Sequence, residues 1–221
     1  MARVSQAHLD ARRRQILDGA AICFARNGFH ATSMQDVLKE VDLSAGAVYR
    51  YFSGKEELIG AIVAETLESV RGQFERAAEE NPPPPPDILI PRVLGEVLRM
   101  KPELSADGDW LFPRLLIQAW TETLRNEHLA EVMRDGYRQV RALWVRIVES
   151  YQEAGMVRAD VPAESVARIM IAAAQGFAAQ QALFGAVPLE TLGEGLRGLM
   201  SMGAPATAVA GTTGTAGGDS R

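Results

Sequence analysis

The stretch that most constrains the fold runs from residue 32 to residue 55, TSMQDVLKEVDLSAGAVYRYFSGK. Ser33 and Asp36 match a capping box that opens a helix ending near Val41, in which apolar residues recur every three or four positions. An interruption follows, after which Ser44 can cap a second helix. Two short capped helices joined by a tight turn predict a helix-turn-helix, whose second helix enters the major groove of DNA.

The second helix and its flanks carry the side chains that we expect to contact DNA. Small residues at its start let the helix approach base edges closely, and its free N–H groups favour a phosphate. Aromatic and basic side chains that can reach phosphates follow. We expect phosphate contacts from Thr32, Ser33, Tyr49, Tyr51 and Lys55, and proximity to base edges from Ser44, Ala45, Gly46 and Arg50.

These residues resemble the N-terminal domain of the tetracycline-repressor (TetR) family of bacterial transcription regulators. The resemblance covers roughly the first quarter of the chain, and Tyr51 stands where many members carry His. Such a linked set of spacings is far more specific than one short motif. The matching residues are Ile16-Leu17, Ala20, Ala21, Phe24, Gly28-Phe29, Thr32-Ser33, Ser44-Ala45-Gly46, Tyr49-Arg50-Tyr51-Phe52 and Lys55-Glu56-Glu57-Leu58.

The composition allows a sizeable buried core but no membrane span. The chain has 221 residues, of which 47% are hydrophobic. No apolar run approaches the ~20 residues that a membrane helix needs. The N-terminus lacks the apolar segment of a signal peptide, so we expect a cytoplasmic protein without a membrane partner.

The net charge of −5 is divided unevenly along the chain. Residues 1–55 contain eight Lys and Arg against five Asp and Glu, whereas the remainder contains fifteen against twenty-three. A basic head on an acidic body is expected for a regulator with one end facing DNA. The acidic overall balance therefore does not exclude DNA binding.

Only helical patterns are present, so the predicted fold class is all-α. Residues 1–56 are expected to form an N-terminal three-helix domain that contains the helix-turn-helix. Residues 57–203 are expected to form a C-terminal helical domain for ligand binding and dimerisation. Residues 204–221 contain too few aliphatic side chains to bury a core and are predicted to be a disordered tail.

The resemblance implies that a long helix joins the two domains. Ser53 and Glu56 match a second capping box, which predicts a helix extending to about Ala78. Residues 82–86 are all proline and predict a stiff polyproline spacer. The alternative, that this run recruits a partner with an aromatic groove, is the less favoured interpretation.

The resemblance implies that the second domain contains a pocket for a small-molecule effector, without naming its residues. Met and aromatic side chains make adaptable, mostly apolar pockets, in which a few polar groups orient the ligand. The same residues at helical spacing could instead fill the core. A small, fairly apolar or aromatic effector is our hypothesis. The candidate residues are Trp110, Arg114, Leu115, Gln118, Met133, Tyr137, Trp144, Met170, Gln175 and Phe177.

The last two long helices carry small residues that would let a second copy pack closely, although the same residues could pack internally. The resemblance implies a homodimer through these helices, and a helix-turn-helix dimer reads paired half-sites, so we expect a palindromic operator. The residues concerned are Ala172, Ala173, Gly176, Ala179 and Gly185, followed by Leu192, Leu196 and Leu199.

The sequence indicates neither catalysis nor metal binding. His8, His30 and His128 are scattered, without metal-spaced or nucleophile-like partners. The single Cys23 cannot form an internal disulfide and falls on an apolar helix face. We therefore predict no enzyme, no cofactor and no metal.

The predicted function is that of a ligand-responsive, DNA-binding transcriptional regulator, and specifically a repressor that an effector releases from its operator. One alternative is an activator, or a regulator of the same fold controlled by a protein partner. Another is a helical small-molecule-binding protein without DNA function, against which the intact basic run of residues 49–55 argues.

Overall fold

The computed structural model describes residues 6–99, 104 and 111–202. Within these ranges it is helical and contains no strand, so the predicted fold class is confirmed. Trp110 and the predicted tail at residues 204–221 lie outside the described residues. The helices are α1 (Gln6–Asn27), α2 (Met34–Val41), α3 (Ala45–Tyr49), α4 (Lys55–Glu79), α5 (Pro86–Arg99), α6 (Leu111–Glu122), α7 (Glu127–Glu153), α8 (Ala163–Phe184) and α9 (Leu189–Met200).

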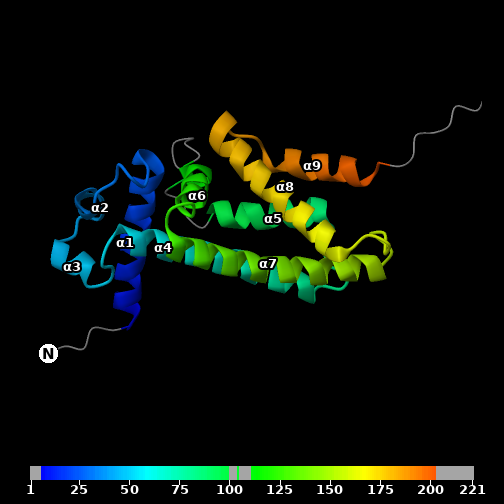
Figure 1. Ribbon diagram of the computed structural model, residues 1–221, viewed down its shortest axis with the longest axis horizontal. Helices are drawn as coiled ribbons and strands as arrows, with labels where there is room; N and C mark the ends of the chain where they lie inside the picture. Colours follow the sequence, from blue (N-terminus) through cyan, green and yellow to red (C-terminus); the bar gives the residue numbers. More distant parts are fainter. Residues whose placement is uncertain (1–5, 100–103, 105–110, 203–221) are drawn as a thin grey trace, which may run out of the picture.

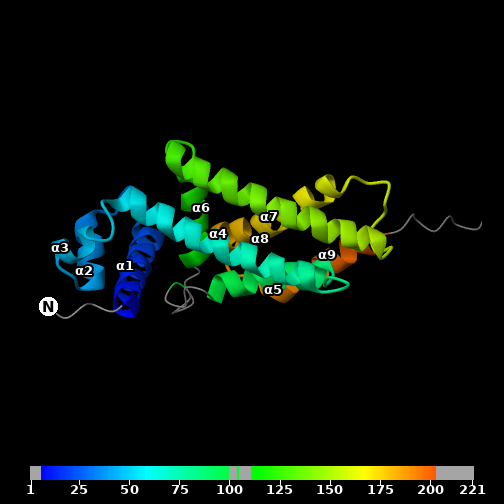
Figure 2. The ribbon, with the colours of Figure 1, turned by 90° about the horizontal axis from the view of Figure 1, so that it is seen from below.

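The helices are arranged as a small head at one end of an elongated body (Figure 1). Helices α1 to α3 form the head, and α4 leads from the head into the body, where it packs along α7. Seen from below, α2 and α3 again lie at the end of the head that is farthest from the body (Figure 2). The body is completed by α5, α6, α8 and α9, with α9 packed on α5 and α8 packed on α7.

The helix-turn-helix forms where the sequence predicts it. The Ser33 hydroxyl oxygen accepts a hydrogen bond from the Asp36 N–H at 3.3 Å, and the Asp36 carboxylate accepts one from the Ser33 N–H at 2.8 Å, which completes the capping box. Asp42 adopts a left-handed conformation with φ of 51° and ends α2. The Ser44 hydroxyl then caps α3 by accepting from the Ala47 N–H at 3.3 Å.

The predicted capping box at the start of α4 was wrong by one residue. Gly54 rather than Ser53 is the N-cap, so the third residue of the helix is Glu57 and not Glu56. The Ser53 N–H and hydroxyl both donate to the Glu57 carboxylate, at 2.7 and 2.8 Å. These hydrogen bonds hold the pKa of Glu57 below its ordinary value. A carboxylate in the first helical turn also interacts favourably with the helix dipole.

The proline-rich spacer is shorter than predicted. Pro86 belongs to α5, where a proline in the first turn costs no helical hydrogen bond. The buried Tyr151 of α7 donates its hydroxyl to the carbonyl of Pro84 and so ties the spacer to the body. Desolvation by burial raises the pKa of Tyr151, which keeps this donor protonated.

The core of the body centres on the contact between α4 and α7. The Phe74 and Trp144 rings lie 5.0 Å apart between centroids, and Trp144 is only 1% exposed. Such tilted aromatic pairs stabilise the fold by more than the burial of their surface alone.

None of the helices in the described part of the chain combines the length and the apolar character that a membrane-spanning segment requires.

The contact between α5 and α9 generates a stability prediction. A Cβ added at Gly193 would lie 2.8 Å from the Asp87 carbonyl oxygen, so Gly193→Ala must displace the α5 backbone. We expect this variant to lower the free energy of unfolding by about 1–3 kcal/mol, the usual cost of overpacking. The measurement is denaturant unfolding of the purified protein.

Gly60 of α4 provides the matched control for that measurement. A Cβ added there meets no atom within 4 Å, so Gly60→Ala should leave stability unchanged or raise it by up to about 1 kcal/mol through helix propensity. If Gly193→Ala destabilised the protein no more than Gly60→Ala, the close packing of α9 on α5 would be contradicted.

Candidate DNA-binding surface and ligand cavity

The short helix α3 is anchored from one side and exposed on the other. Val48 is fully buried and Phe52 is 3% exposed, and both pack into the core of the head. The residues around this anchor are exposed and include five of the predicted DNA contacts: Ser44, Ala45, Gly46, Tyr49 and Arg50. A Cβ added at Gly46 would meet nothing within 4 Å, so the surface at the start of α3 is open.

Ser33 and Tyr51 flank this exposed surface. Ser33 is exposed and Tyr51 is half-buried. The Ser33 hydroxyl also donates to the Asp36 carboxylate at 2.6 Å, and its hydrogen bonds hold the pKa of Asp36 below its ordinary value. The carboxylate therefore stays charged at the N-terminus of α2, where the helix dipole favours it.

The predicted phosphate contact of the Thr32 side chain was wrong. Thr32 is 1% exposed, and its hydroxyl donates to the carbonyl oxygens of Gly28 and Cys23, at 2.8 and 3.1 Å. A hydroxyl that is buried and already paired cannot reach a phosphate. Thr32 instead fixes the loop between α1 and α2.

Lys55 holds the same loop from the start of α4. Its ammonium lies 3.0 Å from the Phe29 carbonyl oxygen, 3.2 Å from that of Thr32 and 3.4 Å from that of His30. It also lies 4.8 Å from the centroid of the Phe29 ring. An ammonium has three donors, and these carbonyls engage all of them. The geometry thus gives Lys55 a positioning role in place of the predicted phosphate contact.

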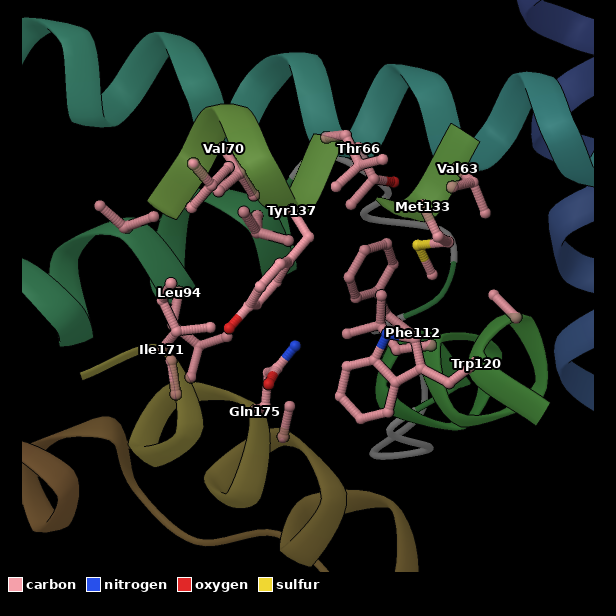
Figure 3. A pocket seen from close by; sticks show the side chains of 18 of the residues that line it. Val63, Thr66, Val70, Leu94, Phe112, Trp120, Met133, Tyr137, Ile171 and Gln175 are labelled. Atoms are coloured by element: carbon pink, nitrogen blue, oxygen red, sulfur yellow. The ribbon is translucent and has the colours of Figure 1, made fainter. Parts of the chain in front are cut away.

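The body contains a cavity of about 190 Å³ between α4, α5, α6, α7 and α8 (Figure 3). Its wall is aliphatic and aromatic, and the described lining residues include no Asp, Glu, Lys, Arg or His. Five of the described lining side chains contain a polar group, namely Thr66, Trp120, Tyr137, Trp144 and Gln175. The Tyr137 hydroxyl and the Gln175 amide point into the same part of the cavity, from α7 and α8 respectively.

The structure brings five of the predicted ligand-binding residues together on the cavity wall and excludes four. Those on the wall are Leu115, Met133, Tyr137, Trp144 and Gln175. Those away from it are Arg114, Gln118, Met170 and Phe177.

These four residues lie away from the cavity because each is on a face of its helix that is turned in another direction. On α8 the residues that face the cavity are Ile171, Ala174, Gln175 and Ala178, which follow the helical repeat. Met170 and Phe177 lie outside the arc of the helix that these four residues occupy, so they point away from the cavity. On α6, Arg114 is exposed and Gln118 faces the head.

The contribution of α4 and α5 to the cavity was not predicted from the sequence. The apolar face of α4, on which Thr66 lies, is equally expected of a helix that only connects two domains. The wall residues from these helices are Ile59, Ile62, Val63, Thr66, Leu67, Val70 and Phe74 of α4, and Ile90, Val93, Leu94 and Val97 of α5. Phe112 and Trp120 of α6 also line the wall.

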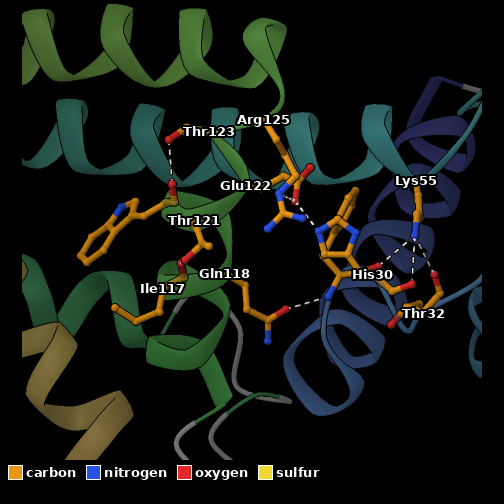
Figure 4. A network of polar contacts seen from close by, with 11 residues as sticks. His30, Thr32, Lys55, Ile117, Gln118, Thr121, Glu122, Thr123 and Arg125 are labelled. Carbon is orange, nitrogen blue, oxygen red and sulfur yellow. Dashed lines mark hydrogen bonds and ion pairs between the residues drawn. The ribbon is translucent and has the colours of Figure 1, made fainter.

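Polar contacts join α6 to the head (Figure 4). The Gln118 side-chain oxygen accepts a hydrogen bond from the Phe29 N–H at 2.8 Å. The Glu122 carboxylate lies 3.0 Å from Nε2 of His30 and 3.7 Å from Nε of Arg125. The body therefore contacts the α1–α2 loop through side chains as well as through α4.

Apolar side chains are exposed along α8 and α9. Ile169 is 66% exposed and Leu183 is 64% exposed, and with Ala172 and Gly176 they form a stripe whose successive members lie three, four and seven residues apart. At the ends of α8 and α9, Phe184 and Leu199 are also exposed. We call these six residues the α8–α9 surface.

The predicted small-residue face coincides only in part with this surface. Leu196 is 7% exposed and belongs to the core, because it points from α9 toward the body. Ala173, Ala179 and Leu192 are half-buried.

The exposed α3 on a helical head, together with an apolar cavity in a helical body, defines a helix-turn-helix regulator with a ligand-sized cavity. Two family models match the chain accordingly. The model described as bacterial regulatory proteins, tetR family, matches residues 16–62, and that of the BetI-type transcriptional repressor, C-terminal, matches residues 112–197. The chain belongs to the TetR family of transcriptional regulators.

Similar proteins are regulators as well. The chain is 31% identical to the uncharacterised HTH-type transcriptional regulator YfiR of Bacillus subtilis over 127 residues, which span 58% of this chain and 60% of that protein. It is 29% identical to the HTH-type transcriptional repressor Rv1474c of Mycobacterium tuberculosis over 167 residues, 74% of this chain and 79% of that protein. Among solved structures, Salmonella enterica GusR matches with 29% identity and a TM-score of 0.67, covering 91% of this chain and 100% of that chain.

Proposed function

We propose that the chain is a homodimeric repressor, not an enzyme, that binds a palindromic operator through α3 and is released by a small, neutral, largely apolar effector. The observation that carries the proposal is the course of α4. Its first residue, Lys55, holds the loop of the DNA-binding head, and its residues from Ile59 to Phe74 line the cavity. One rigid element thus connects the surface that would read DNA to the site that would bind the effector.

The proposed contacts with DNA follow from exposure. Ser44, Ala45 and Gly46 at the start of α3 would approach base edges, because their side chains are too small to hold the helix away from the groove. Arg50 would add a base contact. Tyr49 is 49% exposed and, with Ser33 and Tyr51, would contact phosphates and fix the register.

The proposed effector follows from the wall of the cavity. Because the described lining residues carry no charge, an ionised ligand would lose its hydration without gaining a partner. Flat aromatic side chains and Met133 suit an aromatic or alicyclic group. The Tyr137 hydroxyl and the Gln175 amide would bind one polar group of the ligand. Effector binding would favour a body conformation in which the two heads no longer match the half-sites.

The proposed dimer would form through the α8–α9 surface. An exposed apolar stripe of this kind marks an interaction site, and the small Ala172 and Gly176 would let helices of two copies approach closely. An isologous contact through one face gives a twofold dimer. Such a dimer presents two α3 helices to two half-sites.

DNA binding is tested with the DNA upstream of the chain's own gene, against scrambled DNA at fixed salt concentration. Arg50→Ala should weaken specific binding by about 1–3 kcal/mol and reduce discrimination against scrambled DNA, because a base contact is lost. Tyr49→Ala should weaken binding to both DNAs alike. Gel-shift titration measures all affinities.

Arg146→Ala, which removes an exposed charge from α7 in the body, is the control and should bind as the wild type does. Equal loss on both DNAs for Arg50→Ala would reduce Arg50 to a phosphate contact. A wild-type protein that binds no DNA even at low salt would contradict the proposed function.

Ligand charge is tested with naphthol, naphthoate and naphthylmethylammonium, which share a ring system and differ in charge. Naphthol should bind about tenfold or more tightly than either ion, because the described wall residues offer no counter-charge. Quenching of Trp120 and Trp144, both on the wall, measures binding. Gln175→Leu should weaken naphthol binding selectively. Tighter binding of either ion would contradict a neutral effector.

The dimer is tested by sedimentation velocity. Ile169→Glu places a charge on the α8–α9 surface and should convert the dimer to a 24.0 kDa monomer, because the carboxylate would be buried without a partner. Met156→Glu is the control, since Met156 is 48% exposed and lies in the connection between α7 and α8. If Ile169→Glu remained dimeric, the interface would lie elsewhere.

A further inference from the structure

Helix α6 faces the cavity on one side and the head on another. Gln118 and Glu122 are four residues apart and therefore share one helix face, which is turned toward the α1–α2 loop. The residues of α6 that line the cavity are Phe112, Leu115, Leu116, Ala119 and Trp120. A rigid helix with these two faces cannot move at the cavity without moving at the head.

The contact of Gln118 is with the backbone of the head. Phe29, whose N–H donates to Gln118, follows Gly28, which has a φ of +90° and ends α1. A Cβ added at Gly28 would lie 3.8 Å from the same Gln118 oxygen. The side chain of Gln118 thus supplies a hydrogen-bond acceptor at the point where the chain leaves α1. This hydrogen bond fixes the position of α6 relative to the turn after α1.

The contact of Glu122 adds a buried charge. Its side chain is only 7% exposed, and its carboxylate is paired with His30 of the head and with Arg125 just beyond the end of α6. A carboxylate withdrawn from water is strongly disfavoured when one partner is removed. The contact between His30 and Glu122 therefore stabilises the observed placement of the head against α6.

The α1–α2 loop is clamped between two helices that both line the cavity (Figure 4). Lys55 of α4 binds three carbonyls of the loop, and Gln118 and Glu122 of α6 bind it from the other side. Attachment to α4 alone would leave the head able to pivot about that helix. The second attachment, through α6, removes this freedom.

We propose that Gln118 and Glu122 are positioning residues that transmit occupancy of the cavity to the DNA-binding head. This inference rests on the proposed function. A ligand that shifts α6 relative to α4 draws the two attachments of the loop apart and turns the head. Because coupling between two sites is reciprocal, DNA that holds the head in its bound orientation must weaken ligand binding by the same factor.

The first test measures hydrogen exchange at the Phe29 amide in the free protein. Gln118→Ala should increase its exchange by about tenfold or more, because the acceptor is lost. Thr121→Ala is the control on the same helix, since its exposed hydroxyl bonds only to the Ile117 carbonyl. If the Phe29 amide of the Gln118→Ala variant exchanged as slowly as in the wild type, the proposal would be overturned. This outcome does not depend on whether the protein binds DNA.

The second test measures coupling, as the ratio of naphthol dissociation constants with and without saturating DNA from the chain's upstream region. The wild type and Thr121→Ala should give a ratio of about five or more. The double variant Gln118→Ala/Glu122→Gln should give a ratio near one while keeping naphthol binding in the absence of DNA. An unchanged ratio in the double variant would overturn the proposal.

The two tests separate this inference from the proposed function. A wild-type protein that binds no DNA even at low salt contradicts the regulator itself, and it removes the coupling role with it. A wild type that shows coupling, with a double variant that couples equally well, leaves the regulator standing and rejects the role of Gln118 and Glu122.

Discussion

The structure depends on one helix being buried in two cores at once. Leu58 and Ile59 of α4 are completely buried beside the head, whereas Phe74, farther along, packs against Trp144 of the body. Burial of apolar surface is roughly additive along the helix, so both contacts stabilise the same straight element. The head and the body therefore cannot reorient by bending a linker. They can reorient as α4 tilts or as α6 shifts against it, so in the proposed dimer the spacing of the two heads would depend on what packs against α4 and α6 in the body.

The cavity lies where such control is possible. Close-packed interiors resist small voids, because the lining atoms lose their dispersion contacts. A cavity of about 190 Å³ with walls on five helices is thus a place where a ligand can contact all five helices at once. The described wall residues carry no charge, so these contacts would be mostly apolar, with the Tyr137 and Gln175 side chains orienting one polar group. Binding there stabilises one relative placement of α4, α6 and α8 over others.

The parts of the structure that the sequence predicted are those that local chemistry determines. The Ser33–Asp36 box and the Ser44 cap involve residues three positions apart, and their hydrogen bonds form as expected. The exposure of Tyr49 and Arg50 follows from the anchoring of Val48 in the same short helix. The N-cap of α4 was misplaced by one residue because both Ser53 and Gly54 can occupy that position. Glu56 and Glu57 are adjacent and identical, so the sequence alone does not show which of them is the third residue of the helix.

The parts that the sequence could not predict depend on which face of each helix meets which neighbour. Helical spacing groups Gln118 with Glu122 and groups Leu115 with Ala119, but it does not say which group faces a cavity. Gln118 meets Phe29 across 89 positions in the chain, and no local pattern marks such a pair. A polar residue on an otherwise apolar helix is therefore ambiguous in sequence, since either a ligand or another domain can satisfy it. Here the same helix does both, with Trp120 at the cavity and Gln118 at the head, and that division is what allows the two sites to influence each other.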